Sequence, residues 1–234
     1  MYEFESNVRF SEVDADGKLQ WLALLDYFQD SSVAHSENLH VGNDYLRAHD
    51  IAWLLIGWQI HLERRPHLCD KIHIQTWPYS MKDFYGKRNF RMVDENGEIL
   101  AYADSTWVMI NLANGHPVKI PKEVIEAYEY EEPIPMESMG RQLKVPTEYR
   151  QMEGIVVPPY FIDTNHHMNN GRYLQVALSY LPEGFMPKIL QVEYRKEALL
   201  GDILYPRVTV EEEAITVVLT DEGGKPYSIL KFLK

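Results

Sequence analysis

The stretch Val13-Asp-Ala-Asp-Gly-Lys-Leu19 returns further along the chain as Ile162-Asp-Thr-Asn-His-His-Met168. Later, at a second offset, residues 59–70 align with residues 191–202. Identity is low in both alignments, but the two keep the same order along the chain, which indicates an internal duplication. We therefore expect two similar folding units in tandem.

The first half has one long helical pattern and several strand patterns. Residues 19–37 contain no Pro or Gly and carry apolar residues three and four positions apart, which predicts a helix with one apolar face. A turn is predicted at residues 94–97, where Asp94-Glu-Asn-Gly97 separates two β-forming runs. The expected strands, rich in Val, Ile and aromatic residues, lie at 2–10, 52–62, 71–79, 85–93 and 99–112.

The second half repeats this order after an acidic, proline-containing stretch. A short helix is expected at 121–128 and a linker at 129–150, since Pro133, Pro135 and Pro146 interrupt regular structure. A helix at 169–180 is then followed by strands near 188–198, 203–211, 215–220 and 227–232. We predict an α+β protein in which a sheet wraps a helix in each half, with domains at 1–128 and 151–234.

Composition excludes several classes of protein. The formal net charge of -12 argues against a general nucleic-acid binder. The single Cys69 excludes an internal disulfide, which favours a reducing compartment. We find neither a signal-peptide pattern at the N-terminus nor an apolar run of about 18 residues, so we expect no membrane span and a cytoplasmic location.

Three polar residues in the second copy of the repeat are candidates for chemistry. Asp163, Asn165 and His167 alternate, so in an extended segment their side chains would project to one side. Residues 169–170 are both Asn and suit a helix N-terminus, where free backbone N–H groups favour developing negative charge. The alternative is that Asp and Asn simply make a turn and a cap.

Other common sites lack their parts. The adjacent His166 and His167 are too few for a metal centre, which needs three or more convergent ligands. We find no Gly-x-Ser-x-Gly elbow and no Gly-rich phosphate loop before a helix. We therefore predict no metal and no cofactor.

The second copy of the repeat lies in a longer recognisable box. The run Asp163-Thr-Asn-His-His-Met-Asn-Asn-Gly-Arg-Tyr173 resembles the Asp-x-Asn-x-His-x-Asn-Asn-x-x-Tyr box of the acyl-acyl carrier protein (acyl-ACP) thioesterases of plant plastids and bacteria. Residues 53–77, 97–122 and 192–197 are similar to that family too, so the likeness covers nearly the whole chain. It implies a tandem double hotdog fold and hydrolysis of fatty acyl-ACP thioesters, which releases free fatty acid and ends chain elongation.

The resemblance also implies roles for individual residues. Asp163, Asn165 and His167 match the family positions, and Glu197 matches the acidic residue that the family places in its site. The plant enzymes then have a cysteine where this chain has Ala198, so water rather than a thiol is the expected nucleophile. Glu197 would be the general base, although from the sequence alone a surface ion pair with Arg195 or Lys196 is an alternative.

The first half lacks this Asn and His, and we expect it to supply the acyl pocket. The alternative for each candidate lining residue is plain core, and the alternative for each candidate docking residue for the acidic carrier protein is solvated surface charge. An acyl-coenzyme A thioesterase and a non-catalytic acyl-binding module remain as alternatives, and a homodimer is left open. The candidate lining residues are Leu22, Leu25, Phe28 and Trp53, and the candidate docking residues are Arg64, Arg65 and Arg88.

Overall fold

The computed structural model describes residues 1–137 and 142–234. Its internal contacts divide the chain into two compact units. The first comprises residues 1–56 and 60–137, and the second comprises residues 57–59 and 138–234. The predicted linker at 129–150 includes residues 138–141, which lie outside the described residues.

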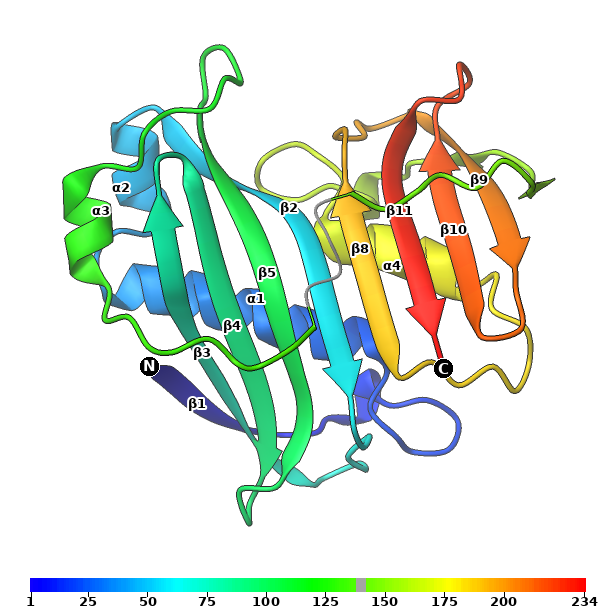
Figure 1. The fold of residues 1–234 in the computed structure, drawn as a ribbon, viewed down its shortest axis with the longest axis horizontal. Coiled ribbons are helices and arrows are strands. Elements are labelled where there is room, and N and C mark those ends of the chain that lie inside the picture. The colour runs from blue at the N-terminus through cyan, green and yellow to red at the C-terminus, as the bar shows by residue number, and fades with distance from the viewer. Residues whose placement is uncertain (138–141) are drawn as a thin grey trace. The chain divides into compact units, whose positions relative to one another are not determined.

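The first unit contains one long helix, two short helices and five strands (Figure 1). The predicted helix and the four strands that follow it are confirmed to within about three residues at each end, whereas α2 was not predicted. The elements are β1 (Tyr2–Asn7), α1 (Trp21–Asn38), α2 (Asn43–Ala48), β2 (Ile51–Leu62), β3 (Lys71–Lys82), β4 (Tyr85–Asp94), β5 (Ile99–Asn111) and α3 (Lys122–Ala127).

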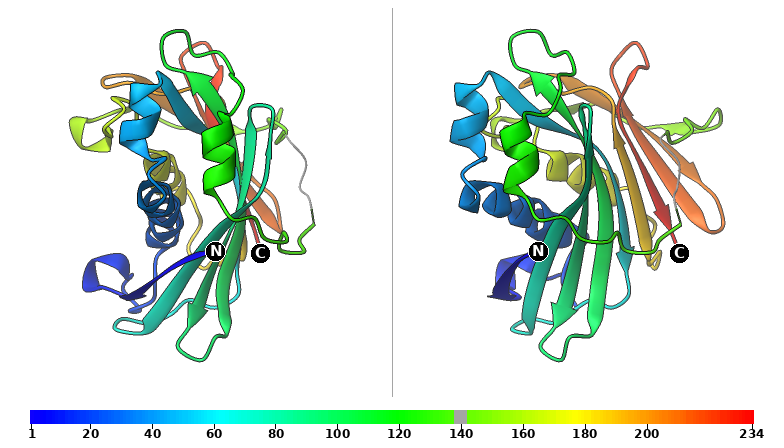
Figure 2. Two further views of the ribbon diagram at one scale, coloured as in Figure 1. Left: turned by 90° about the vertical axis from the view of Figure 1, so that its left-hand side faces the viewer. Right: turned by 60° about the vertical axis from the view of Figure 1, so that its left-hand side comes forward.

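The sheet of the first unit runs in the order β1-β3-β4-β5-β2. Its pairs β1·β3, β3·β4 and β4·β5 are antiparallel. Helix α1 contacts β1 and β3 and lies along one face of this sheet, as Figure 2 shows. Phe28 of α1 and Phe90 of β4 are fully buried with ring centroids 5.4 Å apart, so the apolar helix face and the sheet form one core.

The second unit repeats this plan with a shorter helix. A single turn of 3-10 helix at Pro159–Phe161 precedes α4, as another at Phe10–Glu12 precedes α1. The elements are β6 (Arg150–Gln151), β7 (Ile155–Val156), α4 (Asn170–Leu178), β8 (Ile189–Tyr194), β9 (Ile203–Val210), β10 (Ala214–Thr220) and β11 (Pro226–Leu233).

The sheet of the second unit runs in the order β8-β11-β10-β9-β6, with β7 also pairing with β9. Helix α4 packs on β10 and β11, where Leu174 and Ala177 are fully buried with Val217 and Ile229. The α+β class is therefore confirmed, with one helix against one antiparallel sheet in each unit.

Candidate active site

The box at residues 163–167 forms a tight turn stapled by Asp163. The backbone N–H of Asp163 donates to the carbonyl of His167 (2.9 Å), and that of His166 donates to the carbonyl of Asp163 (3.1 Å). The N–H of Asn165 donates to Oδ1 of Asp163 (2.8 Å). Of the two conformations that the sequence left open, the turn is therefore confirmed and the extended segment is wrong, because the short Asp side chain captures a neighbouring N–H and bends the chain.

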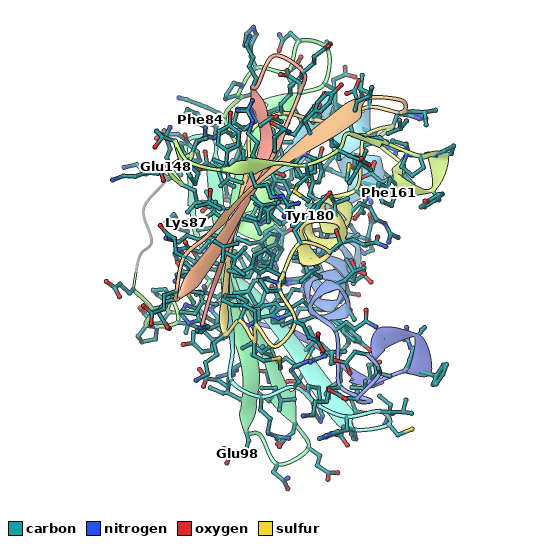
Figure 3. All side chains as sticks on the ribbon, turned by 90° about the vertical axis from the view of Figure 1, so that its right-hand side faces the viewer. Phe84, Lys87, Glu98, Glu148, Phe161 and Tyr180 are labelled. Carbon is teal, nitrogen blue, oxygen red and sulfur yellow. The ribbon has the colours of Figure 1, made fainter. Side chains whose placement is uncertain are left out.

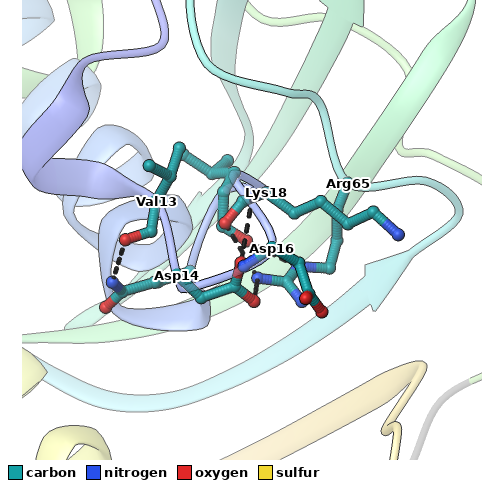
Figure 4. Close-up of polar contacts among 7 residues, drawn as sticks. Val13, Asp14, Asp16, Lys18 and Arg65 are labelled. Atoms are coloured by element: carbon teal, nitrogen blue, oxygen red, sulfur yellow. Dashed lines mark hydrogen bonds and ion pairs between the residues drawn. The ribbon is translucent and has the colours of Figure 1, made fainter.

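The first unit contains the same turn (Figure 4). The N–H of Asp14 donates to the carbonyl of Lys18 (2.9 Å), and that of Gly17 donates to the carbonyl of Asp14 (3.0 Å). The N–H of Asp16 donates to Oδ1 of Asp14 (3.0 Å). Each bond has its counterpart in the second unit at the aligned position, so the first repeat alignment is confirmed by the geometry of the backbone. We call these two turns the Asp14 loop (residues 13–19) and the Asp163 loop (residues 162–168).

Each loop is hydrogen-bonded to a segment of the second alignment, residues 59–70 in the first unit and residues 191–202 in the second. The N–H of Leu19 donates to the carbonyl of Pro66 (2.9 Å), and the N–H of Met168 donates to the carbonyl of Ala198 (2.8 Å). The second alignment, which places Pro66 opposite Ala198, is therefore confirmed as well.

The single cysteine occupies a turn that has a counterpart at the aligned position of the second unit. Cys69 and Gly201 both have left-handed backbone conformations, with φ of 70° and 84°. The N–H of Cys69 donates to the carbonyl of Val8 (2.9 Å), as that of Gly201 donates to the carbonyl of Val157 (3.1 Å). Cys69 is thus the structural counterpart of Gly201 and not of Ala198.

Glu197 lies beside His167 in the second unit. Its Oε2 atom is 3.3 Å from Nε2 of His167, and the two side chains are 43% and 35% exposed. The alternative ion pairs are not formed: Arg195 pairs with Glu193 at 2.7 Å, and Lys196 pairs with Asp221 at 3.2 Å. The structure therefore joins a carboxylate and an imidazole at a distance from which a proton can transfer with slight closure.

The counterpart of Glu197 in the first unit is Arg65. Its guanidinium donates to Oδ2 of Asp14 (2.6 Å), to the carbonyl of Leu19 (2.6 Å) and to the carbonyl of Lys18 (2.9 Å). Partial burial acts to raise the pKa of Asp14, but the backbone N–H of Lys18 and the Arg65 guanidinium outweigh it and hold that pKa below its usual range. This position therefore carries a structural cation in one unit and a candidate base in the other. The alignment places the two residues opposite each other, but it did not reveal the contacts of Arg65.

Asn169 caps helix α4, as predicted. Its side-chain oxygen accepts from the N–H of Gly171 (2.9 Å), and its own N–H donates to the carbonyl of Phe161 (2.8 Å). Of the three backbone N–H groups of residues 169–171, at the start of α4, two are therefore already bonded. Within the part of the chain that the structure describes, the N–H of Asn170 is the one of the three without such a bond.

A second polar contact fixes the segment after β8 that carries Glu197. The buried N–H of Ala198 donates to the hydroxyl oxygen of Tyr173 (2.9 Å), and Tyr173 is only 2% exposed. Burial, with the nearby Glu197 carboxylate adding to it, raises the pKa of the Tyr173 phenol, which therefore stays protonated. Tyr173 ends the box quoted from the sequence, but its partner could not be predicted because the contact joins a helix to a distant segment.

The predicted pocket residues fall into three environments, all in the first unit. Leu25 and Phe28 are fully buried in the core of the sheet and helix. Leu22 lines an open groove of about 550 Å³ formed by residues of α1, β1 and the turn at Phe10–Glu12. Trp53 lies against Gly86, where an added Cβ would meet the indole ring at 3.0 Å. Their role in acyl binding stays a prediction.

The predicted docking residues differ in their access to solvent. Arg64 is 53% exposed and pairs with Asp94 at 2.7 Å, whereas Arg65 is held by the Asp14 loop and is 17% exposed. Arg88 is only 6% exposed, so its assignment to a docking surface is wrong. Its side chain enters the core of the first unit.

The buried guanidinium of Arg88 is held by polar groups of that core. It donates to Nδ1 of His35 (3.0 Å) and Oγ1 of Thr76 (3.1 Å) and lies 5.2 Å from the ring centroid of Tyr128. Burial and the Arg88 charge lower the pKa of His35 to about 3, so its ring stays neutral and accepts the bond.

Among the described residues, neither a metal centre nor a spanning helix is found. Within residues 1–137 and 142–234, no group of three or more His, Cys, Asp or Glu side chains converges on one point that would suit a metal ion. Among the same residues, no helix combines the length and apolar character needed to cross a membrane.

Comparison with protein families matches both halves of the chain. The acyl-ACP thioesterase N-terminal domain matches residues 1–128, and the acyl-ACP thioesterase C-terminal domain matches residues 145–225. A chloroplastic palmitoyl-acyl carrier protein thioesterase of Cuphea hookeriana is 26% identical over 239 residues, covering 93% of this chain and 55% of the relative. The chain thus spans about half the length of the first curated relatives it matches.

Solved structures resemble the chain over nearly its whole length. An acyl-ACP thioesterase from Bacteroides thetaiotaomicron has a TM-score of 0.90 at 24% identity, covering 99% of this chain and 96% of that one. A 12:0-ACP thioesterase from Umbellularia californica has a TM-score of 0.89 at 20% identity, with the same coverage. These likenesses confirm the predicted tandem double hotdog fold.

Proposed function

The chain belongs to the acyl-ACP thioesterase family, and we propose that it hydrolyses fatty acyl-ACP thioesters at the Asp163 loop. The observation that carries the proposal is the distance of 3.3 Å between Glu197 Oε2 and His167 Nε2. The Asp14 loop of the first unit has the same backbone as the Asp163 loop but lacks these side chains. We propose that only the second unit carries out the chemistry.

We propose that water is the nucleophile. Glu197 takes a proton from the water as its oxygen bonds to the thioester carbon, and the Asn165 amide orients that water or the carbonyl. Ala198 offers no thiol for covalent attack, and Cys69 belongs to a turn of the first unit. The unbonded N–H of Asn170, at the capped start of α4, is the candidate donor to the oxyanion.

The carbon–sulfur bond then breaks and the thiol departs. His167, within reach of Glu197, passes the proton taken from water to the leaving sulfur, so that acid and thiol are released and the site returns to its starting state. Asp163 does not need to touch the substrate, because its bonds to the backbone of Asn165 and His167 hold the loop in shape. Glu197 and His167 are therefore the two residues that transfer protons in the proposed reaction.

The test is thiol release from a medium-chain or long-chain acyl-ACP by the wild type and three variants. We expect Glu197→Gln, Asn165→Ala and His167→Ala each to lower kcat by about 10²-fold to 10⁴-fold. A matched control is Glu193→Gln, since Glu193 lies four residues earlier and pairs with Arg195. Wild-type rates in all three variants would overturn the site assignment.

Acyl-coenzyme A carries the same phosphopantetheine thioester without the carrier protein. We propose the carrier protein as the substrate because the matched family and the relatives described above are named for it. Comparing kcat/KM for the same acyl chain on both carriers tests this, and equal values would overturn the preference. Absence of thiol release from both would favour a non-catalytic acyl-binding module.

A further inference from the structure

The buried contact between Tyr173 and Ala198 has no counterpart in the first unit. In the repeat alignment Tyr173 lies opposite Leu24, and Ala198 lies opposite Pro66. Leu24 has no polar atom on its side chain, and Pro66 has no backbone N–H. The first unit therefore closes the same junction with two groups that need no hydrogen bond.

The change from Leu24 to Tyr173 and the change from Pro66 to Ala198 depend on each other, because a buried N–H without an acceptor is unfavourable. The N–H of Ala198 lies in the core beside α4, and Ala198 is fully buried. A buried backbone N–H without an acceptor is strongly unfavourable, so a residue other than Pro at this position needs an acceptor nearby. The Tyr173 hydroxyl supplies that acceptor, and it does so from the first turn of the helix that follows the Asp163 loop.

The contact also fixes the backbone next to Glu197. On one side the carbonyl of Ala198 accepts from Met168, at the end of the Asp163 loop, and on the other its N–H donates to Tyr173. Both peptide groups that flank the Cα atom of Ala198 are therefore anchored, and one of them is bonded directly to Glu197. Displacement of a reacting group by about 1 Å can cost about 10²-fold in rate.

We propose that Tyr173 is a positioning residue of the hydrolase, holding the Glu197–Ala198 peptide so that the Glu197 carboxylate reaches His167. The hydroxyl acts through the backbone and touches neither water nor thioester. This inference rests on the proposed role of Glu197 as the base.

The test uses two variants, one that removes the acceptor of the Tyr173–Ala198 hydrogen bond and one that removes both the acceptor and the donor. Tyr173→Phe keeps the ring but leaves the Ala198 N–H unbonded, and we expect kcat to fall at least tenfold while KM changes less than twofold. Adding Ala198→Pro removes the orphaned donor and reproduces the Leu24–Pro66 junction, so we expect the double variant to regain kcat to within about threefold of the wild type. A kcat that stays low in a folded double variant would overturn the proposal.

Two further measurements keep the test decisive. Amide hydrogen exchange of Tyr173→Phe reports on the contact even if the proline variant fails to fold: we expect the Ala198 N–H to exchange at least tenfold faster than in the wild type, and an unchanged rate would overturn the proposal. Tyr180→Phe, beyond the C-terminal end of α4 (Figure 3), is the matched control and should keep the wild-type kcat.

Glu197→Gln in the same assay separates the two proposals. If it is inactive while Tyr173→Phe has the wild-type kcat, the positioning role alone is wrong. If Glu197→Gln itself retains full activity, the proposed site is wrong.

Discussion

The Asp14 loop and the Asp163 loop have the same backbone and opposite chemistry. Each is a turn stapled by an Asp whose Oδ1 atom accepts a neighbouring N–H, and each is tied to the junction that follows the aligned strand. The difference lies in the side chain that approaches from that junction, which is Arg65 in the first unit and Glu197 in the second. The Arg65 guanidinium donates to one side chain and two carbonyls of its own loop, whereas Glu197 approaches His167 of its loop, where we propose that the thioester is hydrolysed.

The comparison predicts that one substitution can convert the second loop into the first. In Glu197→Arg the guanidinium can reach the carboxylate of Asp163 as Arg65 reaches Asp14. We therefore expect a folded protein whose kcat is reduced by at least about 10³-fold. Thiol release and a urea unfolding curve check both statements. Glu197→Gln is the control without a cation, and a kcat within tenfold of the wild type in Glu197→Arg would contradict the comparison.

At the position equivalent to Glu197, Arg65 is expected to stabilise the first unit and not to take part in catalysis. Arg65→Ala removes the guanidinium donor from the Leu19 carbonyl, from Oδ2 of Asp14 and from the Lys18 carbonyl, which keeps only the N–H of Asp14. We therefore expect the free energy of unfolding to fall by about 2 kcal/mol. The kcat of the folded protein should not change. Arg64→Ala is a matched control, since Arg64 is 53% exposed and should cost about 0.5 kcal/mol. A lower kcat in Arg65→Ala without loss of stability would show that the first loop takes part in catalysis.

The two loops also differ at the residue with a left-handed backbone. Gly17 has a φ of 73°, and its counterpart His166 has a φ of 63°. A side chain is disfavoured in this region, so His166→Gly should raise the free energy of unfolding by about 0.5 kcal/mol. Thermal unfolding measures the change, and Gly17→Ala should shift the midpoint downward. A loss of stability in His166→Gly would mean that the imidazole makes a contact that offsets the strain.

The smallest expected effect is the dependence of the Arg65 contribution on pH. Because the folded state lowers the pKa of Asp14 below 3.8, the unfolded chain binds more protons there and this stability is lost as pH falls. The stability difference between the wild type and Arg65→Ala should therefore narrow between pH 7 and pH 3, by a fraction of a kcal/mol because the pair is partly exposed. Urea unfolding at both pH values tests this, and a difference that widens would contradict it.

The sequence predicted the repeat, the order of the elements and the box because these depend on local patterns. Apolar spacing located α1 to within two residues, and the box correctly located the start of α4. Alternation of Asp163, Asn165 and His167 left both an extended segment and a turn open, since it does not distinguish a strand from a turn made by Asp, and the structure has the turn.

The omissions concern contacts between distant segments, whereas the error over Arg88 concerns a local pattern. Arg88 alternates with Phe90 and Met92 on β4, a pattern that already placed it on the buried face of that strand. The roles of Arg65 and Tyr173 could not be predicted, because each joins residues that are far apart in the sequence. The contrast between Leu24–Pro66 and Tyr173–Ala198 was visible in the alignment but has meaning only once the contact is known.

Each loop is shaped by main-chain hydrogen bonds and by the side chain of one Asp, so its backbone does not depend on the other side chains. This matters when an activity is assigned to a protein from its structural similarity to a homologue. A comparison of backbones alone would score the Asp14 loop as a second copy of the site. A loop of this shape in another protein is therefore informative about activity only when the residues at the positions of Asn165, His167 and Glu197 are read as well.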